Sequence, residues 1–271
     1  MCTIIALFGV HRLPLVIAAN RDEFYARTAD PPMVLAPRIV AGRDQRSGGT
    51  WLGATSDGFF VGLTNQRAWE GGGAGPKSRG DVVLAGLRAG SVAAMNRYLD
   101  QLDPREFAGF NLLYGDAKHL SVAYARPTLK DVEHHALEAG IHVLANDRLE
   151  SPDFPKTGRA RERAQKLLAH PWPRLGEELK TLLRDRERPP LSEVPLPPAG
   201  SPFTHELVRE LQALCIETPV YGTVSATLLA MSEAGVQAHW YADGAPHKVD
   251  FSDFSALHDP GEGAASFEKT R

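Results

Sequence analysis

The second residue of the chain, Cys2, combines a nucleophilic thiol with a position next to the N-terminus. If Met1 is removed, this one residue carries a thiol and a free α-amine, with ordinary pKa values of about 8.5 and about 7.7 to 8. The amine can then accept the thiol proton near neutral pH, as acyl transfer by an N-terminal nucleophile requires. The alternative is a buried cysteine that acts only as a small apolar side chain at the start of a strand.

Two apolar runs at the start of the chain predict how Cys2 is positioned. Residues 3–8 and 15–19 are almost entirely apolar, and residues 9–14 between them contain glycine and proline. This pattern predicts an antiparallel hairpin of two strands that are buried on both faces. Cys2 opens the first strand and Asn20 closes the second, so the two residues should lie at the same end of the hairpin.

The second strand is followed by four polar residues, Asn20, Arg21, Asp22 and Glu23. Side chains alternate between the faces of a strand, so Asn20 and Asp22 should face one way and Arg21 and Glu23 the other. All four therefore cannot contact Cys2. At least one charge is expected to form an Arg-carboxylate pair that seals the strand end.

The remaining pattern predicts strands at both ends of the chain and helices grouped between them. Two sheets with helices outside them would bury such apolar strands. Because no repeat or linker divides the chain, we expect a single domain over residues 1–271 with a frayed tail from about residue 260. The expected strands are 39–41, 50–55, 59–64, 110–114, 120–125, 131–138, 141–145, 223–231, 236–241 and 248–251, and the expected helices are 82–89, 92–102, 157–170, 175–186 and 204–214.

Three short stretches carry local signals. Asn65 and Asn146 each follow a predicted strand, where asparagine is either a turn former or a site residue. Ser78 and Asp81 have the spacing of a helix capping box. The glycine-rich residues 71–78 lack the Gly-Lys-Ser/Thr order of a phosphate-binding loop and are expected to form a mobile loop over a site.

Composition excludes several classes of function. The 271 residues are 43% hydrophobic, carry a net charge of −3 and contain only two cysteines. Without a basic stripe, nucleic acid is not an expected partner. No apolar run is long enough to span a membrane, and no signal peptide is recognisable. With no disulfide framework or four-cysteine metal site available, we expect a cytoplasmic protein without a bound metal.

Several motifs resemble, in order along the chain, those of the NRDE family, also called the transport-and-Golgi-organisation protein 2 family. The resemblance extends from residue 1 to about residue 231, and it is more distant to penicillin V acylase and conjugated bile acid hydrolase. Those two are N-terminal nucleophile hydrolases, and their likeness implies an α+β fold, a four-layer αββα sandwich of two mainly antiparallel sheets with helices outside. The matching motifs are Met1-Cys2, Ala18-Ala19-Asn20-Arg21-Asp22-Glu23-Phe24-Tyr25, Gly48-Gly49-Thr50-Trp51-Leu52-Gly53, Leu63-Thr64-Asn65, Ser78-Arg79-Gly80, Phe110-Asn111-Leu112, Leu144-Ala145-Asn146 and Tyr221-Gly222-Thr223.

The resemblance implies a role for each site residue. Cys2 would be the nucleophile, its own amine would be the base, and Asp22 would hold that amine. Arg21 would favour the thiolate, as a nearby cation does. Asn65 and Asn146 would donate amide hydrogens to the oxyanion of the tetrahedral intermediate. The substrate-binding residues expected from the same motifs are Asn20, Trp51 and Arg79.

One position departs from the family pattern. Where the family usually has Tyr-Gly-Thr-Arg, this chain has Val224 after Thr223. If the missing arginine binds the substrate, this chain acts on different substrates. If the arginine supports catalysis, the activity itself is affected.

The resemblance supports two functions. The first is a cysteine-type N-terminal nucleophile hydrolase that cleaves a non-peptide amide bond of a small acyl-amide substrate, without a cofactor. The alternative is a binding protein for haem or a lipid metabolite, because family members are linked to haem trafficking and lipid homeostasis. For that alternative, His134, His135 or His142 could ligate iron.

Overall fold

The computed structural model describes residues 2–69 and 77–259. The predicted glycine-rich loop over a site therefore falls mostly outside the described residues, as do Met1 and the predicted frayed tail. The strands are β1 (Thr3–Phe8), β2 (Leu15–Phe24), β3 (Ala29–Ala36), β4 (Ile39–Asp44), β5 (Leu52–Thr55), β6 (Phe60–Asn65), β7 (Phe110–Gly115), β8 (Leu120–Ala125), β9 (Glu133–Leu137), β10 (Gly140–Leu144), β11 (Tyr221–Ser232), β12 (Gly235–Ala242) and β13 (Ser252–Asp253). The helices are α1 (Arg79–Ala89), α2 (Val92–Leu99), α3 (Pro155–Leu167), α4 (Arg174–Leu183) and α5 (His205–Glu210).

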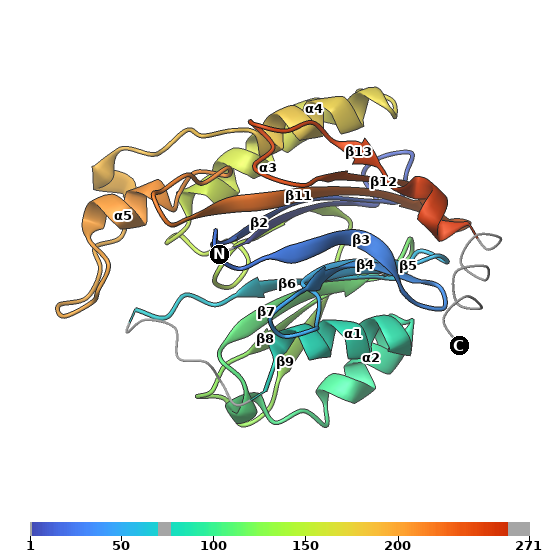
Figure 1. The fold of residues 1–271 in the computed structure, drawn as a ribbon, viewed down its shortest axis with the longest axis horizontal. Coiled ribbons are helices and arrows are strands. Elements are labelled where there is room, and N and C mark those ends of the chain that lie inside the picture. The colour runs from blue at the N-terminus through green and yellow to red at the C-terminus, as the bar shows by residue number, and fades with distance from the viewer. Residues whose placement is uncertain (1, 70–76, 260–271) are drawn as a thin grey trace.

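The strands form two antiparallel sheets that pack face to face. One sheet has the order β10-β1-β2-β11-β12-β13, and the other runs from β3 to β9 in chain order. Helices α3 and α4 cover the outer face of the first sheet, and α1 and α2 cover the outer face of the second (Figure 1). This arrangement confirms the predicted four-layer αββα sandwich.

Alternation of side chains along the strands divides the core into layers. On β1, Ile4 and Ala6 point between the two sheets, whereas Ile5 and Leu7 point toward the helices α3 and α4. Both sets are almost fully buried, which explains why the strands are apolar at consecutive positions. The same parity places Cys2 on the face between the sheets.

The predicted N-terminal hairpin is confirmed, with a longer second strand. β1 and β2 pair antiparallel from Phe8 with Leu15 to Thr3 with Asn20. β2 continues to Phe24 because β11 pairs with its whole length on the other side. The polar residues after Asn20 are therefore held in a sheet, so their alternation persists.

The structure corrects four expectations from the sequence. β3 was not predicted because it contains two prolines, which are tolerated here because β3 is an edge strand. The strand expected at 248–251 is wrong, and a short strand lies at Ser252–Asp253 instead. Ser78 does precede α1, but its side chain makes no capping hydrogen bond. Helix α5 ends at Glu210, four residues earlier than expected.

Candidate active site

Cys2 lies at one end of the first sheet, between two of the residues that the sequence associates with it. Thr3 and Asn20 form the terminal pair of β1 and β2, so Arg21 is the next residue of β2 on the Cys2 side. On the other side, β1 pairs with β10 up to Leu144, and Asn146 follows two residues later at the same end of the sheet. The fold therefore brings residues 2, 21 and 146 to one edge.

A small cavity of about 10 Å³ adjoins Cys2. Besides Cys2, its lining includes Arg21 from β2, Trp51 from the loop before β5, Leu63 from β6 and Thr227 from β11. A space of this size holds about one water molecule. The site is thus closed around the thiol, with Cys2 only 7% exposed.

The guanidinium of Arg21 is fixed from two directions. Its Nη2 donates to Asp44 Oδ2 at 3.1 Å, and both side chains are buried. Its guanidinium carbon also lies 4.3 Å from the centre of the Trp51 ring, in a cation–π contact. Asp44, which the sequence analysis missed, accepts a second hydrogen bond from Arg27 at 2.8 Å. The expected Arg-carboxylate pair at the strand end is therefore present.

Burial determines the protonation of the Cys2 thiol. Removal from water raises the pKa of the thiol above its ordinary value, and the negative charge of Asp22 adds to this increase. The backbone N–H of Asp22 and the charge of Arg21 lower the pKa, but they do not reverse the effect of burial. The thiol is thus held protonated, and a base must remove its proton when it reacts.

Asp22 lies on the opposite face of β2 from Arg21 and is 1% exposed. The Thr223 hydroxyl donates to its Oδ1 at 2.6 Å, and the Tyr221 hydroxyl donates to its backbone carbonyl at 2.8 Å. Burial raises the pKa of Asp22 from 3.8 to about 6, although the charge of Lys156 and the hydrogen bond from Thr223 act against burial. Asp22 is therefore ionised at neutral pH. Keeping this buried carboxylate ionised lowers the free energy of unfolding of the protein.

This cost predicts how an Asp22→Asn variant behaves. Between about pH 4 and pH 6 the folded state keeps a proton on Asp22 that the unfolded state has lost, so the free energy of unfolding decreases as pH rises. A difference of about two pKa units corresponds to about 3 kcal/mol. We expect Asp22→Asn to lack this decrease and to be more stable than the wild type at pH 7 to 8. Urea unfolding of both proteins from pH 4 to 8 measures this difference in the free energy of unfolding.

Asp131→Asn is the control for this measurement, because Asp131 is an exposed surface carboxylate. The control variant should follow the wild-type curve. If Asp22→Asn follows it as well, the buried carboxyl does not carry the cost assigned to it.

The side chain of Asn20 faces the helices instead of Cys2. Its amide donates both hydrogens, to the carbonyl oxygens of Leu183 and Leu214, at 2.9 Å each. These bonds join β2 to the end of α4 and to the segment before β11. Asn20, which was expected to bind substrate, therefore has no amide hydrogen left with which to do so.

Asn65 and Asn146, the two predicted oxyanion donors, are in contact. The Nδ2 of Asn146 donates to the backbone carbonyl of Asn65 at 2.6 Å, and the Asn146 carbonyl accepts from the N–H of Arg67 at 2.8 Å. Among the described residues, the second Asn146 amide hydrogen makes no hydrogen bond. Asn65 is two residues after Leu63, which lines the Cys2 cavity, so their side chains share a face of β6.

Two glycines bring Arg79 to the site. A Cβ on Gly49 would lie 2.8 Å from the backbone carbon of Gly80, so the loop before Trp51 and the start of α1 approach as closely as two backbones can. Arg79 is half-buried, and its Nη1 donates at 3.5 Å to the carbonyl of Gly109. Burial lowers its pKa, and among the described residues it forms no ion pair with a carboxylate. Arg79 is thus a cation available to an anionic group.

Val224 occupies a bulge in β11. Thr223 pairs with Asp22 and Ser225 pairs with Arg21, so Val224 is the extra residue of the ladder and is half-buried. The position where the family usually has arginine therefore lies beside the β2 residues of the candidate site.

One buried charge near the site, Lys156, was not expected from the sequence. Lys156, in the first turn of α3, is 0% exposed. Its pKa is lowered by burial and raised by the charges of Asp22 and Cys2. The signal in the sequence was the spacing of Lys156 with Ala160 and Ala164, which places three residues on one face of the helix.

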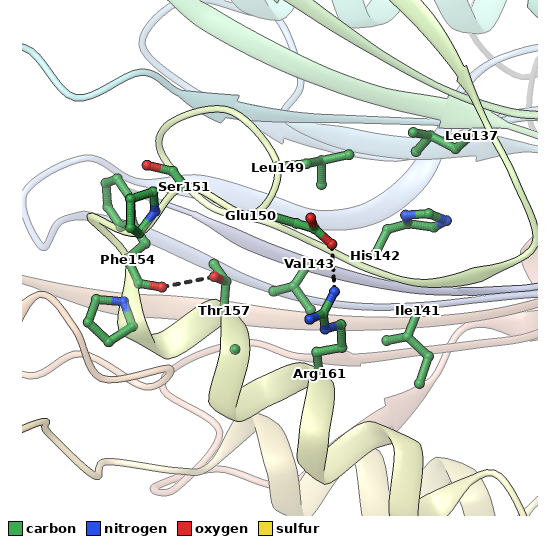
Figure 2. Close-up of a pocket in the computed structure, with 13 residues that line it drawn as sticks. Leu137, Ile141, His142, Val143, Leu149, Glu150, Ser151, Phe154, Thr157 and Arg161 are labelled. Atoms are coloured by element: carbon green, nitrogen blue, oxygen red, sulfur yellow. Dashed lines mark hydrogen bonds and ion pairs between the residues drawn. The ribbon is translucent and has the colours of Figure 1, made fainter.

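A second and larger cavity lies beside the edge strand β10. Its volume is about 470 Å³, and Figure 2 shows apolar side chains on several of its walls. Two of its lining residues, Glu150 and Arg161, form an ion pair at 2.5 Å. Of the three histidines considered as iron ligands, only His142 lines this cavity, and its Nε2 lies 2.9 Å from the Glu138 carbonyl oxygen. The Nε2 of His134 instead lies 2.9 Å from Asp100 Oδ1.

Comparison with solved structures defines the fold class. The structure resembles that of a mutant of conjugated bile acid hydrolase from Clostridium perfringens, with a TM-score of 0.53 over 96% of this chain and 94% of that one. The sequences are 10% identical, so the likeness concerns the fold alone. Together with the four layers described above, it places the chain among proteins with the N-terminal nucleophile hydrolase fold.

Comparison with sequences defines the family. The chain belongs to the Transport and Golgi organisation 2 family, whose family model matches residues 1–242. It is similar to the human Transport and Golgi organization protein 2 homolog, with 29% identity over 243 residues, which cover 82% of this chain and 83% of the human protein. A mouse homolog is 28% identical over 241 residues, with the same shares covered. No helix within residues 2–69 and 77–259 is long and apolar enough to cross a membrane.

Proposed function

We propose that this protein is a cysteine-type N-terminal nucleophile hydrolase that cleaves a non-peptide amide bond of a small molecule. The observation that carries the proposal is the position of Cys2. It immediately precedes the central strand β1, faces a cavity shared with Arg21 and Trp51, and lies next to the strand that holds the buried carboxylate of Asp22. A cysteine that served only as apolar filling would not need these charged neighbours.

The chemistry begins after removal of Met1. The α-amine of Cys2 takes the thiol proton, and the sulfur attacks the carbonyl carbon of the amide. Asp22 orients the amine, while an amide hydrogen of Asn146, with Asn65 beside it, stabilises the oxyanion. The ammonium then gives its proton to the leaving nitrogen, and an acyl thioester remains. Water attacks the thioester, releases a carboxylic acid and restores the thiol.

The charges around the site indicate the class of substrate. Arg21 is neutralised by Asp44 and cannot readily bind a second anion. Arg79 has no carboxylate partner among the described residues, and Val224 supplies no charge where the family usually has arginine. An N-acyl amide with one anionic group, bound by Arg79, therefore fits better than a substrate with two.

The experiment that tests the proposed function starts from intact mass. The purified protein is expected to lack Met1, and it should then hydrolyse members of a panel of N-acyl amino acids and uncharged N-acyl amides. The acidic members should have the lower KM. Soluble protein that retains Met1 throughout, or a panel without any hydrolysis, would count against the proposed function.

The larger cavity supports a second candidate function, the binding of haem or a lipid metabolite. Its volume of about 470 Å³ is in the range of small-molecule sites. Its apolar walls suit such a ligand, and the Nδ1 of His142 could coordinate iron. Haemin titration should then give a saturable Soret band that His142→Ala abolishes and the control His134→Ala retains. A signal that does not saturate, or that ignores His142, would mean nonspecific adsorption.

A further inference from the structure

Lys156 is a buried cation that the proposed chemistry has not yet used. Ala160 and Ala164, four and eight residues later, pack into the core beneath α3, and Lys156 shares their side of the helix. Its Nζ donates to the carbonyl of Leu211 at 3.2 Å. Within the described part of the chain, no carboxylate lies in ion-pair distance of it. Burying an ammonium group that makes one hydrogen bond and no ion pair lowers the stability of the fold. A lysine at this position therefore calls for a functional explanation.

One short segment, residues 211–216, connects Lys156 to the candidate site. Its first carbonyl accepts the bond from Lys156, and its fourth accepts an amide hydrogen of Asn20 at 2.9 Å. Its last backbone N–H donates at 2.9 Å to Thr223, whose hydroxyl donates to Asp22 Oδ1 at 2.6 Å. Lys156 and Asp22 therefore lie on the same side of the sheet and are linked by one hydrogen-bonded segment.

The charges of these groups act on one another. Lys156 lowers the pKa of Asp22 against the effect of burial, and Asp22 and Cys2 raise the pKa of Lys156 against the same effect. Charges on buried groups such as these interact more strongly than charges in water, because water is excluded between them. The charged and titratable groups around this region are Lys156 and Arg159 from α3, Asp22 and Glu23 from β2, Cys2 just before β1, Cys215 from the connecting segment and Tyr221 from β11.

The mechanism creates a need for such a cation. A carboxylate that holds the α-amine of Cys2 also stabilises its protonated form, and an ammonium group cannot accept the thiol proton. A second positive charge nearby has the opposite effect on the amine, while it keeps the carboxylate ionised. A buried lysine beside the Asp22 side of the strand supplies that charge.

We propose that Lys156 is a positioning residue whose buried charge keeps Asp22 ionised and favours the neutral, proton-accepting form of the Cys2 α-amine. This inference rests on the proposed function, because it assigns Lys156 a role in activating the same nucleophile. Lys156 itself does not contact the substrate. Its effect reaches the reacting sulfur through the amine and through Asp22.

The test is the pH dependence of Cys2 alkylation in protein without Met1. Iodoacetamide is the probe, and mass spectrometry of the N-terminal peptide is the readout. In Lys156→Met, which keeps the length of the side chain but not its charge, the midpoint of the profile should rise by about one pH unit. The rate at pH 7 should fall about tenfold and approach the wild-type rate above pH 9. Lys156→Arg should restore the midpoint.

Lys180→Met is the matched control, because Lys180 is also largely covered but lies on α4 against Trp240, 3.9 Å from its ring. Its profile should match the wild type. If Lys156→Met folds poorly, Lys156→Gln provides a second neutral variant. If Lys156→Met is alkylated more slowly at every pH but with an unchanged midpoint, Lys156 has only a structural role and the proposed electrostatic role is wrong. Wild-type protein in which Cys2 never reacts overturns the proposed function instead.

Discussion

Replacing Cys2 with alanine is expected to reduce amide hydrolysis by at least about a thousandfold, to the background of the uncatalysed reaction. The thiol is the only group in the proposed mechanism that bonds to the substrate, so no neighbour can replace it. Alanine is small, as cysteine is, and should leave both the removal of Met1 and the packing at the start of β1 intact. Initial rates on the best substrate of the N-acyl panel measure the loss.

Cys215→Ala is the control for this variant, because the chain has only two cysteines. Cys215 is 1% exposed, its Sγ lies 3.1 Å from His247 Nδ1, and burial raises its pKa to about 11. A thiol with these properties is a poor nucleophile. Cys215→Ala should therefore hydrolyse the substrate at close to the wild-type rate. Equal losses in both variants would show that the reaction does not depend on the N-terminal thiol.

The hairpin that holds Cys2 could be predicted because its two strands are buried on both faces. Continuous apolar runs and a turn with glycine and proline are strong local signals, and the observed pairing of Thr3 with Asn20 follows from them. Alternation from Asn20 also predicted that Arg21 and Asp22 separate to opposite faces. Both conclusions rest on local geometry, which a single sequence contains.

Other parts of the site depend on contacts between distant segments, which the sequence does not reveal. Asp44 lies after a stretch with several prolines, so its pairing with Arg21 had no local signal. Lys156 begins a helix dense in charged residues, where a lysine ordinarily faces solvent. The bulge at Val224 arises from the pairing of β11 with β2, and only the register reveals it.

The family resemblance supplied what local signals could not. Asparagine at the end of a strand is usually a turn former, and neither Asn65 nor Asn146 differs from that pattern in the sequence alone. In the structure, the ends of β6 and β10 are joined by hydrogen bonds, one of which runs from the Asn146 amide to the Asn65 carbonyl. Their role as oxyanion donors stays a prediction, and mutation of Asn146 is the direct way to test it.

Replacing Asn146 with alanine is expected to lower kcat by about 10² to 10³, or about 2.7 to 4 kcal/mol, because one oxyanion donor is removed. KM should change little, since the oxyanion forms only after the substrate is bound. Asn65→Ala should cost less, because its backbone carbonyl would still hold the Asn146 amide in place. Steady-state kinetics on the same substrate separate the two parameters.

The control must disturb the same loop without removing an oxyanion donor, and Asn111→Ala does so. The buried Nδ2 of Asn111 donates to Thr64 Oγ1 at 3.0 Å and to the carbonyls of Ala145 and Asp147 at 3.3 and 3.1 Å, on either side of Asn146. Its loss should lower the melting temperature and reduce kcat only slightly. If Asn111→Ala and Asn146→Ala lose kcat in proportion to their loss of stability, Asn146 only supports the loop. A large loss of kcat confined to Asn146→Ala identifies the donor, because the transition state alone uses its free amide hydrogen.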